Sequence, residues 1–160
     1  MKLNPSEPET PESKEATIAA CNALLRGELS AVETYGQAID RFKDDPEVAT
    51  LIRIQSEHEQ AVKHLRNLVV DLRGLPETSS GAWGAITKGI QATANLFGEN
   101  SAVKSLQQGE ELGQKAYGDF LEQSDVLSET KETVRNELLP MVTDHINRLE
   151  SVGHSMKADG

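Results

Sequence analysis

The sequence has a single cysteine, few aromatic residues, and fewer basic than acidic side chains. Cys21 has no second cysteine to pair with, so an intramolecular disulfide is excluded and nothing points to an oxidising compartment. Sixteen basic residues against 26 acidic ones give a net charge of −10, which argues against nucleic acid and anionic membrane surfaces as partners. No apolar run approaches the roughly 20 residues of a membrane span, and the first residues lack a signal-peptide pattern. We therefore expect a cytoplasmic protein.

At 160 residues the chain is long enough for one domain with a proper core. Residues 1–14 are rich in proline and acidic side chains and contain almost nothing apolar, so they cannot bury enough surface to become ordered. We predict a disordered acidic tail over 1–14, a helical bundle over 15–152 and a flexible C-terminus over 153–160.

A short motif occurs twice in the chain. Residues 27–36 and residues 109–118 both read Gly-Glu, six residues, Tyr-Gly. The glutamates are Glu28 and Glu110, and each falls where an amphipathic helix should place an apolar residue. A carboxylate on a buried stripe needs a partner, so the two motifs predict a polar site inside the protein.

Four long helices are predicted from apolar residues spaced three and four apart. The first runs from about Pro11 or Glu15 to Phe42, and Asp45-Pro46 resembles an N-cap followed by proline at the start of the second. The second runs to about Arg73 and is ended by Gly74 and Pro76. The third covers about 101–124, and the fourth runs from an N-cap near Ser128 to about Val152. Pro140 lies inside the fourth helix and predicts a kink.

Each buried stripe contains polar interruptions, which are Glu28 in the first helix, Gln55 and His58 in the second, Glu110 in the third and His145 in the fourth. Glu28 lies about 16 residues before the first turn and His58 about 14 after it, so the two are level within roughly 4 Å. Glu110 and His145 are about 16 and 19 residues from the turn near Asp125, so these two are also level within roughly 4 Å. Four inward polar groups can therefore meet in one layer.

Residues 74–100 form a connection long enough to travel the height of a bundle. Residues 82–97 can form a short helix within it, with Trp83, Ile86, Ile90 and Leu96 turned inward. With Phe97, these residues offer more apolar surface than one short helix usually needs to dock. We therefore predict that the protein forms a homodimer.

This pattern resembles the ferritin-like superfamily, whose di-iron site takes one glutamate from each of the first and third helices and a Glu-x-x-His from each of the other two. Glu28 and Glu110 match the lone glutamates, and His58 and His145 match the histidines. The tyrosine seven residues after each glutamate is similar to rubrerythrin-type members. Within the superfamily the chain is most similar to a small bacterial four-helix-bundle family classed as a domain of unknown function. The resemblance implies an all-α, up-down-down-up bundle with a long crossover.

The chain departs from the family pattern at two positions. The bridging glutamates should lie three residues before each histidine, and those positions hold Gln55 and Val142. Two carboxylates balance one divalent ion, so charge counting favours a single metal at Glu28, His58, Glu110 and His145. Two nitrogen and two oxygen ligands suit zinc, with iron or manganese as alternatives. The loss of two carboxylates argues against di-iron oxidase or mineralising activity, and no catalytic residue is assigned.

Gln55, Tyr35 and Tyr117 are expected in a second layer around these four residues, with the tyrosine hydroxyls reaching the polar groups. A different interpretation of the same residues needs no metal. Glu28 and Glu110 would then pair with protonated His58 and His145 as a buried polar network. The chain would be a non-catalytic structural or stress-related bundle. The two histidines favour the metal, whereas Gln55 and Val142 favour the network.

Overall fold

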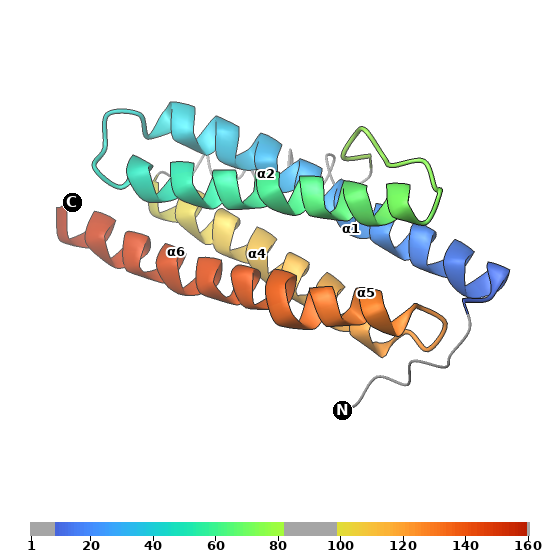
Figure 1. Ribbon diagram of the computed structural model, residues 1–160. Coiled ribbons are helices and arrows are strands. Elements are labelled where there is room, and N and C mark those ends of the chain that lie inside the picture. The colour runs from blue at the N-terminus through green and yellow to red at the C-terminus, as the bar shows by residue number, and fades with distance from the viewer. Residues whose placement is uncertain (1–8, 82–98, 160) are drawn as a thin grey trace.

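The structure of the protein is a computed structural model that describes residues 9–81 and 99–159. The described residues form helices and contain no strand, which confirms the all-α prediction. The helices are α1 (Pro11–Arg41), α2 (Val48–Asp71), α4 (Glu99–Glu122), and a last helix made of α5 (Ser128–Thr133), the π-helical turn η1 (Val134–Leu138) and α6 (Leu139–Asp159) (Figure 1).

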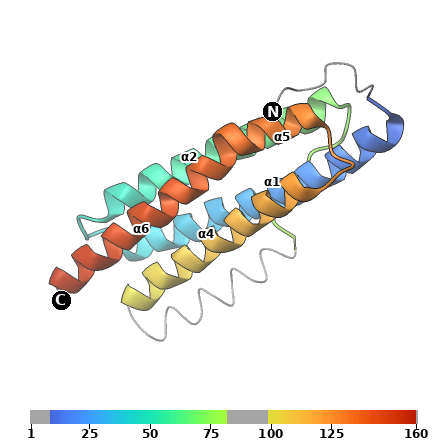
Figure 2. The ribbon, with the colours of Figure 1, turned by 90° about the horizontal axis from the view of Figure 1, so that it is seen from below.

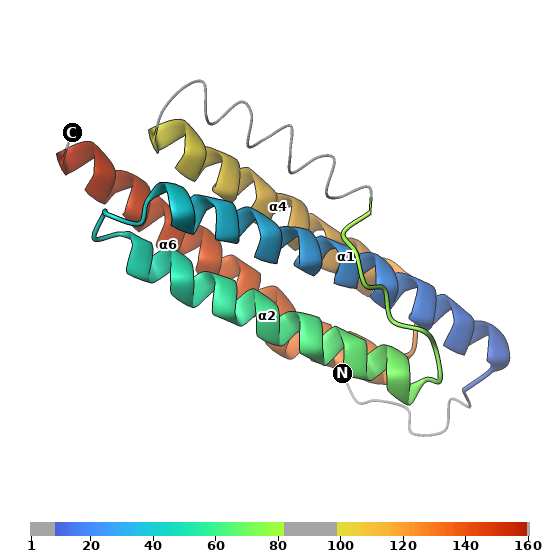
Figure 3. The same cartoon turned by 90° about the horizontal axis from the view of Figure 1, so that it is seen from above.

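The helices pair into two antiparallel hairpins. α1 packs chiefly on α2, and α4 packs on α6. The two hairpins meet mainly through α1 and α4, which lie side by side in the views from below and from above (Figures 2 and 3). Following the colours of Figure 1 along the chain, α2 and α4 run in the same direction, and α1 and α6 run in the opposite one.

The core consists of two hydrophobic clusters separated along the bundle axis. Each long helix contributes to both clusters and has one buried ionisable residue between its two contributions. The first cluster is formed by Cys21, Leu24, Leu25, Ala61, Val62, Leu65, Val69, Tyr117, Phe120, Val126, Val134, Leu138 and Val142. The second is formed by Tyr35, Ala38, Phe42, Leu51, Ile54, Ala102, Val103, Leu106, Leu149, Val152 and Met156. The polar layer predicted from the sequence therefore lies between the two hydrophobic clusters.

The starts of the helices differ in part from the sequence predictions. α1 begins at Pro11 because Thr10 forms a capping box, in which the Thr10 and Ser13 side chains each accept from the other's backbone N–H. The prediction that the second helix starts at Asp45-Pro46 is wrong: the connection is a series of turns and α2 starts at Val48. Ser128 was predicted as an N-cap, but it is the first helical residue and Leu127 is the cap.

The ends of the helices also differ. We predicted that Gly74 and Pro76 end the second helix, but α2 ends at Asp71 and the residue with left-handed backbone is Arg73, at φ 65°. Gly74 is needed for a close approach: a Cβ added there would lie 2.7 Å from Ile18 Cγ2 on α1 and 3.0 Å from Val69 Cγ1. α6 continues to Asp159, so the stretch after Val152 is helical.

Substituting Gly74 by alanine should therefore destabilise the protein by about 1–3 kcal/mol, because the new methyl group overlaps the Ile18 side chain. Gly118→Ala is the matched control. It lies inside α4, where an added Cβ meets nothing within 4 Å in the described part of the chain, so it should stabilise by about 0.5–1 kcal/mol. Urea unfolding of both variants measures the two changes, and equal shifts would contradict the packing at Gly74.

The last helix carries the irregularity expected near Pro140. We predicted a kink there, and the structure has a π-helical turn immediately before Leu139 and Pro140. The Leu139 N–H reaches back five residues to the Val134 carbonyl. Val134 and Leu138 remain buried, so the wider turn keeps this helix in contact with the first core cluster.

The predicted short helix over 82–97 lies outside the described residues. Of the predicted connection over 74–100, the structure describes 74–81 and the start of α4. The homodimer prediction depends on that segment and stays a prediction. Within 9–81 and 99–159, no helix combines the length and apolarity that crossing a membrane requires.

Candidate metal centre

Four residues predicted from the sequence form a buried layer in the middle of the bundle. Glu28 from α1, His58 from α2, Glu110 from α4 and His145 from α6 are each at most 4% exposed. Each stands between the two core clusters on its own helix. Charged groups enclosed in this way must be paired or bind an ion, because the burial of an isolated charge is very costly.

His58 connects the two glutamates. Its Nδ1 lies 2.5 Å from Glu28 Oε2, and its Nε2 lies 2.7 Å from Glu110 Oε1. A carboxylate can only accept hydrogen bonds, so both ring nitrogens donate only when the imidazole is protonated. Burial alone would lower the pKa of His58, but the charges of Glu28 and Glu110 outweigh it and raise the pKa from 6.5 to about 10. In the metal-free protein, His58 is therefore a cation between two anions.

The pKa of Glu110 is shifted by the same interaction in the opposite direction. Burial acts to raise the pKa of its carboxyl group, but the positive charge of His58, together with the polar contacts to His145 and His58, prevails, and the pKa falls to about 2. Glu110 is thus ionised throughout the physiological range, as a metal ligand or an ion-pair partner must be.

The two tyrosines of the repeated motif donate to the glutamates in a crossed pattern. Tyr35 on α1 donates to Glu110 Oε1 on α4 at 2.6 Å, and Tyr117 on α4 donates to Glu28 Oε1 on α1 at 2.5 Å. Burial, followed by the nearby carboxylates, raises the pKa of each phenol well above 10, so both remain donors. The sequence prediction that these hydroxyls reach the polar layer agrees with this geometry.

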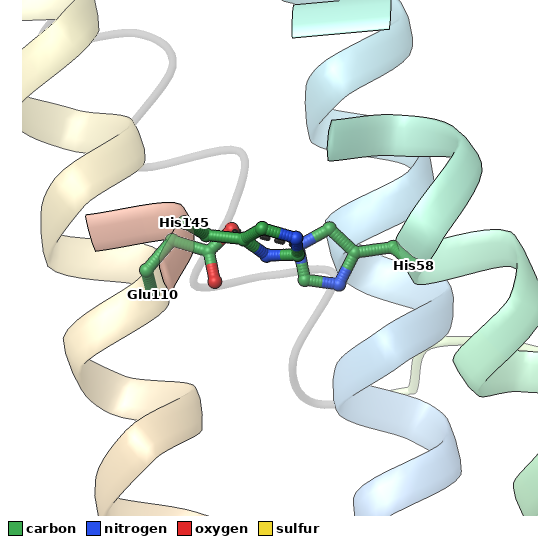
Figure 4. A group of neighbouring side chains, drawn as sticks. All are labelled: His58, Glu110 and His145. Atoms are coloured by element: carbon green, nitrogen blue, oxygen red, sulfur yellow. Dashed lines mark hydrogen bonds and ion pairs between the residues drawn. The ribbon is translucent and has the colours of Figure 1, made fainter. Parts of the chain in front are cut away.

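His145 completes the layer from the other side. Its ring lies 4.7 Å from that of His58 between centroids, and its Nδ1 is 3.3 Å from Glu110 Oε1 (Figure 4). That distance allows an electrostatic attraction, but this buried nitrogen has no hydrogen-bond partner among the described residues. An orphaned imidazole nitrogen at the centre of a bundle requires an explanation.

Glu57 also reaches the layer, although the sequence does not place it among the ligands. On the sequence alone it is a surface charge that could swing toward the site; in the structure its Oε1 lies 3.2 Å from His145 Nε2, and its Oε2 accepts from Arg148 at 3.0 Å. The available signal was charge complementarity between α2 and α6, since Arg148 follows His145 by three residues and so shares its face.

Gln55, predicted in the second layer, is half-buried and bonds to the backbone of α1. Its Nε2 donates to the Val32 carbonyl at 3.0 Å, and it makes no hydrogen bond to the four residues of the layer in the described structure. Val142, the other position where the family pattern has a glutamate, is buried in the first core cluster. The single cysteine, Cys21, is in the same cluster, and burial raises the pKa of its thiol to about 12.

Three of the four predicted ligands lie close enough together to hold one ion. One ligand atom each from His58, Glu110 and His145 lies within 4.8 Å of the other two (Figure 4). Glu28 stands behind this group, on the Nδ1 side of His58. A pocket of about 70 Å³ between α1 and α4 reaches the layer, and its lining includes Glu28, His58, Glu110 and the small residues Gly27, Ala31, Gly109 and Gly113.

Comparison with known proteins gives a family. No curated protein and no solved structure matched the chain. One family model matched residues 16–123, a range that includes Glu28, His58 and Glu110 and ends before His145. The match covers more than half of the 160 residues. The chain therefore belongs to the family described as a domain of unknown function, DUF2383.

Proposed function

We propose that this protein is a ferritin-like helical bundle that binds one divalent metal ion at His58, Glu110 and His145. The observation that carries the proposal is the Nδ1 atom of His145. It belongs to a fully buried ring, lacks a hydrogen-bond partner in the described structure, and lies 3.3 Å from Glu110 Oε1. The three residues together place one ligand atom each within 4.8 Å of the others. Metal coordination would use its lone pair, whereas in the metal-free network this nitrogen faces Glu110 Oε1 at 3.3 Å without a hydrogen bond.

The donor set fits a divalent ion. Two imidazoles and one carboxylate are ligands found in zinc sites and in non-haem iron sites, and manganese also accepts them. Glu28 is placed to accept from the Nδ1–H of His58, so that Nε2 is left for the ion. A carboxylate on the outer nitrogen is the usual way in which proteins orient a metal-binding histidine. The sequence prediction that Glu28 itself binds the ion stays a prediction.

Helix arrangement supports the ferritin-like assignment. α2 and α4 run in the same direction, as an up-down-down-up bundle requires, and α1 and α4 each supply one buried glutamate. Histidines come from α2 and α6, as in the ferritin-like pattern. Gln55 and Val142 replace the bridging carboxylates, so the charge needed for a second ion is absent at those positions. We therefore propose a single ion and no di-iron chemistry.

A second candidate function is supported by His58. Both of its nitrogens already have carboxylate partners, which is a complete arrangement for a protonated, metal-free ring. In that case the layer is a buried polar network that fixes the register of four helices, and the protein is a non-catalytic structural bundle. The two candidates differ in what His145 does: its Nδ1 binds the ion in the first, and in the second it faces the Glu110 carboxylate at 3.3 Å as an ion-pair partner.

Thermal melting with and without metal separates the two functions. Zinc, manganese or anaerobic iron at a hundredfold excess over the dissociation constant should stabilise the wild type by about 2.7 kcal/mol relative to protein in chelator. His58→Ala and His145→Ala should each abolish that gain. His64→Ala is the control, since His64 is partly exposed and pairs with Glu137 away from the layer. A wild type whose melting temperature ignores all three metals would refute metal binding and leave the network.

A further inference from the structure

His145 is held from outside the layer by a carboxylate. Its Nε2 faces Glu57 Oε1 at 3.2 Å, and Glu57 comes from α2, the helix that also carries His58. The contact spans the interface between the two hairpins, with the ring fully buried and the carboxylate 27% exposed. Glu57 is therefore at the boundary between solvent and the buried layer.

This contact decides which nitrogen of His145 carries the proton. A carboxylate accepts hydrogen bonds and does not donate them, so Nε2 carries a proton, and in the neutral ring it is the only nitrogen that does. Nδ1 then has a lone pair, and it is this atom that faces Glu110 and His58. His58 has the corresponding arrangement with Glu28 on its outer nitrogen. Both histidines thus have one carboxylate behind them and share Glu110 in front.

Arg148 fixes the orientation of Glu57. Its Nη1 donates to Glu57 Oε2 at 3.0 Å, which leaves Oε1 directed at His145. The Nε of Arg148 pairs with Asp144 Oδ2 at 2.8 Å, one turn earlier on α6. Asp144, Arg148 and Glu57 therefore form a chain of ion pairs that ends on the ring of His145.

We infer that Glu57 is a positioning residue of the metal centre: it selects the His145 tautomer in which Nδ1 presents its lone pair to the ion, and Arg148 keeps the carboxylate in place. This inference rests on the proposed metal-binding function. It adds a residue that the ferritin-like pattern did not assign in this chain. Glu57 is next to His58 in the sequence, but its side chain contacts His145, the histidine of α6.

The experiment compares Glu57→Ala with Asp144→Ala. Each substitution removes one carboxylate that pairs with Arg148, but of the two side chains only that of Glu57 pairs with the His145 ring. Nitrogen-15 NMR of the metal-free proteins reports which ring nitrogens of His145 are protonated. Titration with zinc then gives the dissociation constant of each variant.

We expect His145 to carry its proton on Nε2 in the wild type and in Asp144→Ala, and to lose this preference in Glu57→Ala. Zinc affinity should fall by about 10–100-fold in Glu57→Ala, the usual effect of removing such a partner, and by no more than about twofold in Asp144→Ala. Glu57→Gln, whose amide oxygen can still accept from Nε2, should retain the tautomer and recover part of the affinity.

An unchanged tautomer in Glu57→Ala, or a wild-type ring protonated on Nδ1, would overturn the role of Glu57. Wild-type protein that binds no zinc, iron or manganese would overturn the metal-binding function instead. The two failures are distinguishable because the NMR measurement is made without metal.

Discussion

Replacing His58 by alanine in the metal-free protein should lower the free energy of unfolding by about 3–5 kcal/mol, because it leaves Glu28 and Glu110 buried without their shared cation. Both carboxylates are nearly inaccessible to water, so solvent cannot replace the lost partner. Urea unfolding in the presence of chelator measures the change. His64→Ala, at a partly exposed position on the same helix, should alter stability by less than about 0.5 kcal/mol.

A double-mutant cycle separates this ion pair from the cavity that alanine also creates. Glu28→Ala, His58→Ala and the double variant should show a coupling free energy of about 1–3 kcal/mol, since the second substitution removes the charge that the first one strands. Additive effects would mean that the 2.5 Å contact between Glu28 and His58 contributes only packing.

Raising the pH should destabilise the metal-free protein between about pH 6.5 and pH 10. The folded protein binds a proton at His58 up to a pKa of about 10, whereas the unfolded chain releases it near 6.5. In that window the folded state holds more protons than the unfolded state, so stability is fully present below pH 6.5 and declines as pH rises. Each pKa unit corresponds to about 1.4 kcal/mol, which puts the total loss on the order of 5 kcal/mol at most.

His58→Ala is the control for this pH dependence, because other groups titrate over the same range. The variant should have a markedly flatter decline, and parallel curves for variant and wild type would contradict a protonated His58. Saturating zinc should also flatten the decline, since a metal ion on Nε2 takes the place of the proton. The pH measurement therefore tests the network and the metal centre with one set of samples.

Much of the polar layer could be predicted because its signal is local. Glu28, His58, Glu110 and His145 interrupt apolar stripes at helical spacing, and helix lengths alone place them at one level. The partners within the layer could not be predicted in the same way. Whether Tyr35 donates to Glu28 or to Glu110 depends on the register of α1 against α4. The apolar pattern of one helix carries no information about its register against another.

The remaining misses have similar causes. Glu57 lies off the buried stripe of α2, and only the packing of α6 brings His145 and Arg148 to it. Asp45-Pro46 is a strong local start signal, but the turns of the interhelical connection delay α2 to Val48. Gly74 resembles a helix terminator in the sequence, whereas its position against Ile18 is a tertiary contact.

The crossed tyrosines have a consequence for the order of folding. Tyr35 and Glu110 are 75 residues apart in sequence, and Tyr117 and Glu28 are 89 apart, so neither bond can form inside one hairpin. Contacts this distant carry the largest loop-closure entropy and form after local ones. Two preformed hairpins must therefore meet before the carboxylates receive their phenol donors. A slip of one helical turn between α1 and α4 would break both bonds together, so docking at the correct level is an all-or-none step.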